Sequence, residues 1–178
     1  YLGPVFDIHG GGLDLRFPHH ENELAQSVAA GDQFARYWVH NGLVTSNGQK
    51  MAKSLDNSIS ADDLLRQVNP ATLRYYLLSA HYRSTQDYHQ QALTDAAAAL
   101  TRVTAFQRRA HQQLATTPVA GRLPESFANA LDEDLNAPAA LAVLHDHVRA
   151  GNITLDHGDL TAAADRHRSV STMLNVLG

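Results

Sequence analysis

The spacing of apolar positions changes near residue 60. Before that point, short apolar runs are separated by glycine and asparagine turns, a pattern typical of strands. After it, apolar residues recur every three or four positions, which predicts amphipathic helices. The pattern therefore predicts an α/β part followed by an all-α part.

The first part is predicted to contain strands, one helix and a hairpin. Val5–Ile8 favours a strand, and Gly10–Gly12 after it predicts a turn. A helix is expected over about Pro18–Ala30, because proline fits the first turn of a helix. A further strand is expected over 34–39, and Asn47-Gly48 predicts a hairpin turn after it.

The second part is predicted from caps and apolar stripes. Ser60, Asn69, Asn136 and Asp159 stand where N-caps are expected. From about residue 90, helices with short connections predict a four-helix antiparallel bundle. The residues expected to face inward are Leu73, Tyr76, Leu77, Ala80, Leu93, Ala96, Leu100, Val103, Ala110, Leu141, Leu144, Val148, Leu160, Ala163, His167, Val170, Leu174 and Leu177.

Composition narrows the function class. The 178 residues include no cysteine, so this chain offers neither disulfides nor thiolate metal ligands. No apolar run approaches the length of a membrane span. The net charge of −4 does not indicate nucleic-acid binding, although local patches matter more than the sum.

The two ends of the chain suggest a larger protein. The sequence begins Tyr1-Leu2-Gly3-Pro4 without an initiator methionine, and enters a predicted strand almost at once. It stops at Leu177-Gly178, directly after a helical pattern. Because one strand cannot form a sheet, we expect further sequence upstream.

Candidate metal ligands lie on the first predicted helix. His19 and Glu23 are four residues apart and so share one face, where an imidazole and a carboxylate can reach one cation. His20 and Asn22 are expected on other faces. Gly10–Gly12 and Asp14 lie at the end of the same predicted strand, where open α/β sheets bind ligands. Separately these features fit a plain turn and a surface ion pair, but their combination favours a ligand site.

A second candidate is a lysine loop. Of the fourteen Lys and Arg residues, the two lysines, Lys50 and Lys53, both lie within Lys50–Ser54. Lysine is a compact, flexible point charge that can follow a moving phosphate. A solvated loop is the alternative. His40 and Trp38, between the two stretches, are candidates to line a pocket, although Trp38 fits a core position better.

Four segments resemble cysteinyl-tRNA synthetases. Asp7–Ser27 is similar to their zinc-site region, and Lys50–Ser54 to the Lys-Met-Ser-Lys-Ser loop of class I aminoacyl-tRNA synthetases. Leu73–Ser84 resembles the segment after that loop, and Phe127–Asn152 the helical tRNA-binding region. The resemblance covers nearly the whole chain, and its first motif is long and specific.

The resemblance implies roles for individual residues. In that family zinc binds the substrate thiolate and so selects cysteine over serine, as expected for a soft ligand. His19 and Glu23 match two of the four zinc ligands, and the two cysteine ligands would lie upstream. Lys50 and Lys53 match the catalytic lysines. The residues assigned to binding of the amino acid and ATP are His9, Gly11, Gly12, Asp14, His40 and Lys53.

The resemblance also implies an activity and a domain plan. The activity is ligation of L-cysteine to tRNA(Cys) through a cysteinyl adenylate, with ATP and Mg²⁺, in a cytoplasmic, monomeric parent with no membrane partner. The range 1–58 would be the C-terminal part of a Rossmann-like catalytic domain, 59–89 a stem-contact region, and 90–178 a DALR-like bundle. The arginines expected to meet tRNA phosphates are Arg102, Arg108, Arg109 and Arg122.

The chain departs from the family pattern in several ways. Ala52 replaces the usual serine of the lysine loop. The His-x-Gly-His signature, the zinc cysteines and the C-terminal anticodon domain are not in this sequence, so we expect the chain alone to be inactive.

Two other functions fit part of the pattern. One is the cysteine ligase of mycothiol biosynthesis, which uses an amino sugar as acceptor. The other is a non-catalytic fragment that only binds tRNA. Asp132–Pro138, leading into a bundle, favours a synthetase over the amino-sugar ligase. An upstream cysteine and a His-x-Gly-His motif in the gene would separate an enzyme from a binding module.

Overall fold

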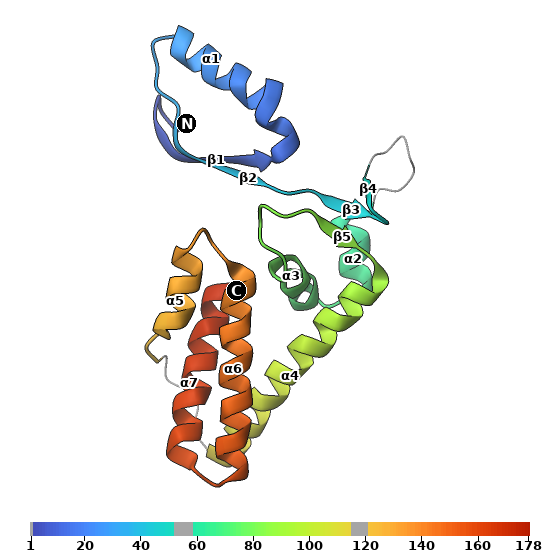
Figure 1. Ribbon diagram of the computed structural model, residues 1–178, viewed down its shortest axis with the longest axis vertical. Helices are drawn as coiled ribbons and strands as arrows, with labels where there is room; N and C mark the ends of the chain where they lie inside the picture. Colours follow the sequence, from blue (N-terminus) through green and yellow to red (C-terminus); the bar gives the residue numbers. More distant parts are fainter. Residues whose placement is uncertain (1, 52–58, 115–120) are drawn as a thin grey trace. The chain divides into compact units, whose positions relative to one another are not determined.

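The computed structural model describes residues 2–51, 59–114 and 121–178 (Figure 1). The chain divides into two compact units. The first comprises Tyr1–Ser58 with Tyr82–Tyr88, and the second Ile59–His81 with His89–Gly178. The strands lie in the first unit and the long helices in the second, as the apolar spacing predicted.

The first unit opens with a strand–helix–strand arrangement. Strand β1 (Phe6–Gly12) leads through a 3₁₀ turn, η1 (Leu13–Leu15), and a π turn, η2 (Arg16–His20), into helix α1 (Glu21–Ala29). The chain returns in β2 (Ala35–Asn41), which pairs with β1 in parallel. Residues after β1 are thereby brought to one end of the strand pair.

Three short strands complete the first unit. The sheet has the order β4 (Gln49–Lys50), β3 (Val44–Ser46) and β5 (Gln86–Tyr88). The predicted hairpin turn is confirmed, because Asn47 and Gly48 both have positive φ, 52° and 74°, between antiparallel β3 and β4. Sequence reasoning did not find β5, since three residues are too few to show a strand period.

The glycine turn predicted after β1 was wrong. Gly10–Gly12 continue the strand and pair with β2. A Cβ on Gly11 would lie 2.8 Å from Cε1 of His20, and one on Gly12 would lie 2.5 Å from Oδ1 of Asp14. The glycines therefore make room for neighbouring side chains rather than turning the backbone.

The predicted start of the first helix was three residues early. Regular α-helix begins at Glu21, after the π turn. Phe17 has extended angles, φ −140° and ψ 133°, inside that turn. A residue before proline is sterically restricted from the helical region, so Pro18 excludes Phe17 from the helix.

The second unit is helical, and its predicted caps are confirmed. The side chains of Ser60, Asn69, Asn136 and Asp159 each accept a hydrogen bond from a backbone N–H of the helix that follows. The helices are α2 (Ala61–Gln67), α3 (Pro70–Leu78), α4 (Gln90–Leu114), α5 (Glu125–Asp132), α6 (Ala137–Asp156) and α7 (Leu160–Leu177).

The core of the second unit lies among α4, α6 and α7, with α5 packed on α6. Its largest fully buried side chains include Phe106, Phe127 and Leu144. Most of the predicted inward positions are buried or half-buried, but Leu77 and Leu160 are 49% and 48% exposed. Leu77 lies beside the buried face of α3 and Leu160 is the first residue of α7, so neither reaches the core.

None of the helices that the structure describes is long and apolar enough to cross a membrane.

Candidate functional site

An aromatic cluster forms where β1, β2 and the start of α1 meet. His9 comes from β1, Trp38 and His40 from β2, and His20 from the end of η2. The ring centroids of His9 lie 5.0 Å from His20 and 4.8 Å from Trp38, both edge to face. The rings of Trp38 and His40 stack at 5.8 Å. Trp38 is only half-buried, so its position is less interior than expected.

Glu23 faces an imidazole with each carboxylate oxygen. Oε2 lies 2.9 Å from Nε2 of His9, and Oε1 lies 3.6 Å from Nε2 of His19. Oε2 is buried, yet among the described residues it has no partner in hydrogen-bond geometry. A buried oxygen in this condition can accept a cation, which suits a metal ligand. His19 is 61% exposed and can also reach a ligand from solvent.

His20 is the buried member of the cluster, 4% exposed. Its Nδ1 lies 2.9 Å from Nε2 of His40, so one of these two nitrogens donates to the other. Burial lowers the pKa of His20, and the neighbouring His9 and His40 lower it further. Neutral imidazole is the form that ligates metals, and a hydrogen bond on the other ring nitrogen orients the ring.

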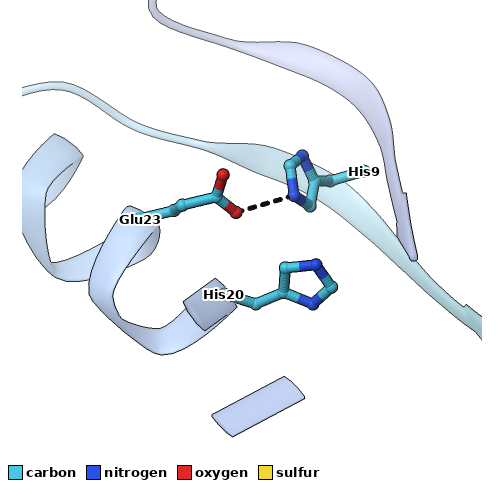
Figure 2. A group of neighbouring side chains, drawn as sticks. All are labelled: His9, His20 and Glu23. Carbon is cyan, nitrogen blue, oxygen red and sulfur yellow. Dashed lines mark ion pairs between the residues drawn. The ribbon is translucent and has the colours of Figure 1, made fainter. Parts of the chain in front are cut away.

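Three side chains form a group that could hold a metal ion. Figure 2 shows Glu23 and His20 reaching from the helical segment toward His9 on the strand. One ligand atom from each of His9, His20 and Glu23 lies within 4.8 Å of the others. Two nitrogens and one oxygen are suitable ligands for zinc.

This group differs from the predicted pair of His19 and Glu23. His20 was expected on another face than Glu23. Positions three residues apart are nevertheless neighbours on a helix, and the chain kinks at Phe17 inside η2, so His20 and Glu23 can reach the same ion. The signal available in the sequence was Pro18, which restricts Phe17 and so marks an irregular entry to the helix.

A small cavity adjoins the cluster. Its volume is about 120 Å³, and Arg16, His20, Leu24, Trp38 and His40 are among its lining residues. His40 and Trp38 therefore line a pocket, as the sequence suggested.

Asp14 and Lys50 meet at a second point of the first unit. Nζ of Lys50 lies 2.8 Å from Oδ2 of Asp14. This hydrogen bond is the main reason that the pKa of Asp14 is lowered from its ordinary value. Gly12 borders the carboxylate closely enough that a Cβ there would collide with it. Lys53 and Ala52 lie outside the described residues.

The fold is that of a class I aminoacyl-tRNA synthetase. Residues 1–98 match the family of tRNA synthetases class I (C) catalytic domain, and residues 126–178 match the DALR domain. The chain belongs to the class I (C) tRNA synthetase catalytic-domain family, which confirms the resemblance seen in its motifs.

Two similar relatives are both named for the same amino acid, cysteine. The chain is 60% identical, over its whole length, to the cysteine–tRNA ligase of Leifsonia xyli subsp. xyli, and covers 38% of that protein. It is 59% identical to the cysteine–tRNA ligase of Clavibacter michiganensis subsp. michiganensis, of which it covers 39%. The chain thus spans less than half the length of these relatives.

Two solved structures share the fold at low identity. A LeuRS of Agrobacterium radiobacter K84, in a ternary complex with tRNA and LeuAMS, has a TM-score of 0.73 at 16% identity, over 94% of this chain and 25% of its own. The methionyl-tRNA synthetase of Mycobacterium tuberculosis, in complex with methionyl-adenylate, has a TM-score of 0.68 at 17% identity, over 96% of this chain and 40% of its own.

Proposed function

We propose that this chain carries part of the active site of a cysteine–tRNA ligase. The reaction joins L-cysteine to tRNA(Cys) through a cysteinyl adenylate formed from ATP with Mg²⁺. The observation that carries the proposal is 60% identity, along the whole chain, to a protein of that name. The relatives compared above are named as tRNA ligases, so the amino-sugar ligase is not favoured. The catalytic-domain match also disfavours a module that only binds tRNA.

The lysines act on the phosphates of ATP in this proposal. Charge builds on phosphate oxygens as the substrate carboxylate attacks the α-phosphate. Lys53 and Lys50 meet that charge, and cations placed for the transition state accelerate the step more than equal binding of the ground state does. Lys50 ends β4, so the hairpin sets where the loop begins.

The strand end holds the amino acid in this proposal. The Asp14 carboxylate binds an ammonium group in the structure, that of Lys50, so its surroundings suit a cationic partner. The α-ammonium of cysteine is the corresponding substrate group. Gly11 and Gly12 keep the strand end free of Cβ atoms, while His9 and His40 provide ring surfaces beside it.

Zinc is proposed to be held by His19 and Glu23, with further ligands outside this chain. Oε2 of Glu23 is buried and makes no hydrogen bond among the described residues, and its neighbour at 2.9 Å is Nε2 of His9, a further possible ligand, which supports a cation at this carboxylate. When bound, zinc supplies a Lewis acid that prefers a thiolate to a neutral hydroxyl, and so separates cysteine from serine. His9 and His20 form the other ligand set that shares Glu23.

The remaining assignments follow from the same proposal. The range 59–89 is the stem-contact region and 90–178 the tRNA-binding bundle. The intact protein is a cytoplasmic monomer. The two regional assignments rest on the family match and on the DALR match at residues 126–178.

Cysteine-dependent exchange of pyrophosphate into ATP tests the function. The intact protein, encoded by the gene that contains this segment, should catalyse the exchange, and Lys53→Ala should lower kcat far more than it raises the KM for ATP. Arg66→Ala is the matched control, since Arg66 is an exposed cation on α2. Exchange that cysteine does not stimulate would overturn the function. A raised KM with normal kcat would remove the proposed role of Lys53.

A further inference from the structure

One carboxylate oxygen holds the β3–β4 hairpin, from which Lys50 extends. Oδ1 of Asp87, on β5, accepts hydrogen bonds from the hydroxyl of Thr45 and from the backbone N–H of Gly48, each at 2.7 Å. Thr45 lies on β3, and Gly48 lies in the turn between β3 and β4. Because the two donors come from different parts of the hairpin, this oxygen fixes the strand and its turn together.

The strand register connects Asp87 to Lys50 through one residue. Strands β4, β3 and β5 lie side by side in one sheet (Figure 1). Thr45 is the partner of Asp87 in the parallel pair of β3 and β5, and the partner of Lys50 in the antiparallel pair of β3 and β4. A shift of Thr45 away from Asp87 therefore also moves the backbone of Lys50.

Both hydrogen bonds restrict the hairpin to one conformation. Thr45 is only 9% exposed, and a buried hydroxyl that loses its acceptor cannot recover the free energy by bonding to water. Gly48 has a φ of 74°, a left-handed conformation in which its N–H reaches Asp87. Hydrogen bonds to an ionised carboxylate are stronger than those between neutral groups, so Asp87 is an effective anchor for both donors.

The segment that carries Asp87 is itself fixed to the chain just before β3. The backbone N–H of Gly42 donates to the carbonyl oxygen of Tyr82 at 2.6 Å. A Cβ on Gly42 would collide with the backbone carbonyl of Ser84, so the two segments approach as closely as glycine allows. Asp87 therefore holds the hairpin from a strand whose own position is set by backbone contacts.

We propose that Asp87 is a positioning residue, which holds the hairpin so that Lys50 reaches Asp14 and then the phosphates of ATP. The inference rests on the proposed function, because it takes Lys50 to meet the charge on those phosphates. Nζ of Lys50 lies 2.8 Å from Oδ2 of Asp14, so its side chain already extends to the end of β1. The lysine side chain is flexible, and a fixed backbone beneath it limits the positions that its ammonium group samples.

Cysteine-dependent pyrophosphate exchange by the intact protein tests this role. Asp87→Ala should lower kcat about 10- to 100-fold with little change in the KM for ATP, as expected when a group that acts in the transition state is misplaced by up to about 1 Å. Asp87→Asn should keep most of the activity, because its amide oxygen can accept both hydrogen bonds. Thr45→Val should lower kcat less than Asp87→Ala does, and Thr45→Ser should retain it.

A Lys50→Ala background separates positioning from a general loss of structure. If Asp87 acts through Lys50, Asp87→Ala should lower kcat much less in that background than in the wild type. Asp32→Ala is the matched control, since Asp32 is an exposed aspartate of the first unit outside both the hairpin and the candidate site. It removes the same charge and should leave kcat unchanged.

Amide hydrogen exchange in the 178-residue chain tests the anchor without the reaction. By ¹H–¹⁵N NMR, the N–H of Gly48 should exchange with solvent several times faster in Asp87→Ala than in the wild type, because it loses its acceptor. In Asp87→Asn the exchange should stay close to the wild-type rate.

Three results would overturn the proposal. They are a normal kcat in Asp87→Ala, an equal loss of kcat with and without Lys50, and exchange of the Gly48 amide that Asp87→Ala leaves unchanged. A wild-type protein that shows no cysteine-dependent exchange would overturn the proposed function and, with it, the role of Asp87 in the reaction. The two failures are distinguishable, because the first requires an active wild type or an altered hairpin amide and the second is seen in the wild type alone.

Discussion

At the scale of single residues, the ion pair between Asp14 and Lys50 shows how one contact prepares a binding site. The Asp14 side chain is 38% exposed, so water can reach the carboxylate, yet Nζ of Lys50 lies 2.8 Å from it. In the proposed reaction a substrate ammonium takes the place of Lys50 on Asp14. Lys50 is then available to the phosphates of ATP, which links the two substrates through one side chain.

Lys50→Ala should raise the pKa of Asp14 toward the ordinary value of about 3.9, because it removes the hydrogen bond that chiefly lowers that pKa. The measurement is an NMR titration of the side-chain carboxyl carbon in the 178-residue chain. Arg36→Ala is the control, since it removes a comparable exposed ion pair with Asp7. If the titration midpoint of Asp14 is the same in the Lys50→Ala and Arg36→Ala variants, Lys50 does not lower the pKa of Asp14.

His20 shows what the sequence does not reveal at this scale. Four-residue spacing placed His19 and Glu23 on one face, and the structure has them 3.6 Å apart. The spacing could not reveal that His20 turns inward to His40, because this contact depends on the kinked segment η2 and on the absence of a Cβ at Gly11. The role of either histidine as a ligand stays a prediction.

Capping and packing dominate at the scale of elements. Capping is a local interaction, so the four N-caps could be predicted from sequence. The strand β5 pairs with β3, and a groove lined by Arg102, Arg109 and Arg149 forms between α4 and α6. Both depend on residues far apart in the chain, which local patterns do not encode. Arg102 and Arg109 were predicted within one basic cluster with Arg108, but only the first two line the groove.

Gly151→Ala should destabilise the second unit although alanine is the better helix former. Gly151 is buried in α6, and a Cβ there would lie 2.4 Å from Cζ of Phe106. Overpacking of this kind costs about 1–3 kcal/mol in the free energy of unfolding, more than the gain of about 1 kcal/mol in helix propensity. Urea denaturation measures the difference.

Phe106→Leu in the same chain is the matched test of this contact. If the ring causes the collision, Gly151→Ala should cost less in the Phe106→Leu background than in the wild type. An alanine that stabilises the wild-type chain would show that the ring moves aside freely.

The second unit should lose stability in mild acid. Burial is the first cause that lowers the pKa of His145, His147 and His167 in the folded state. The unfolded chain, with histidine pKa values of about 6.5, then binds more protons below neutral pH. The unfolding free energy should therefore be highest above about pH 6.5 and fall as the pH drops through that value.

Urea denaturation at several pH values, from neutral to mildly acidic, measures how the unfolding free energy of the second unit depends on pH. His167→Gln should flatten the pH dependence, because His167 is 4% exposed in the core. His157→Gln should not, since His157 is exposed at the end of α6. A pH dependence unchanged by His167→Gln would assign the effect to other groups.

At the scale of the whole molecule, the spacing of apolar residues explains why the fold class could be predicted and the complete site could not. The change from strand to helix spacing near residue 60 predicted the fold class, and the family match agrees with it. In the cluster at the end of β1, the buried Oε2 of Glu23 makes no hydrogen bond among the described residues, although Nε2 of His9 lies 2.9 Å from it. The chain covers only 38% of its Leifsonia xyli relative, which is consistent with a site completed by other sequence.

Zinc content, measured by mass spectrometry after dialysis, tests the central claim most directly. The claim is that His19 and Glu23 are two ligands of a zinc site completed outside this chain. The intact protein should hold one zinc ion, His19→Ala should lose it and His20→Gln should keep it, while the 178-residue chain alone should hold little. Zinc retained by His19→Ala and lost from His20→Gln, or held stoichiometrically by the 178-residue chain, would contradict the account and assign the ion to His9, His20 and Glu23.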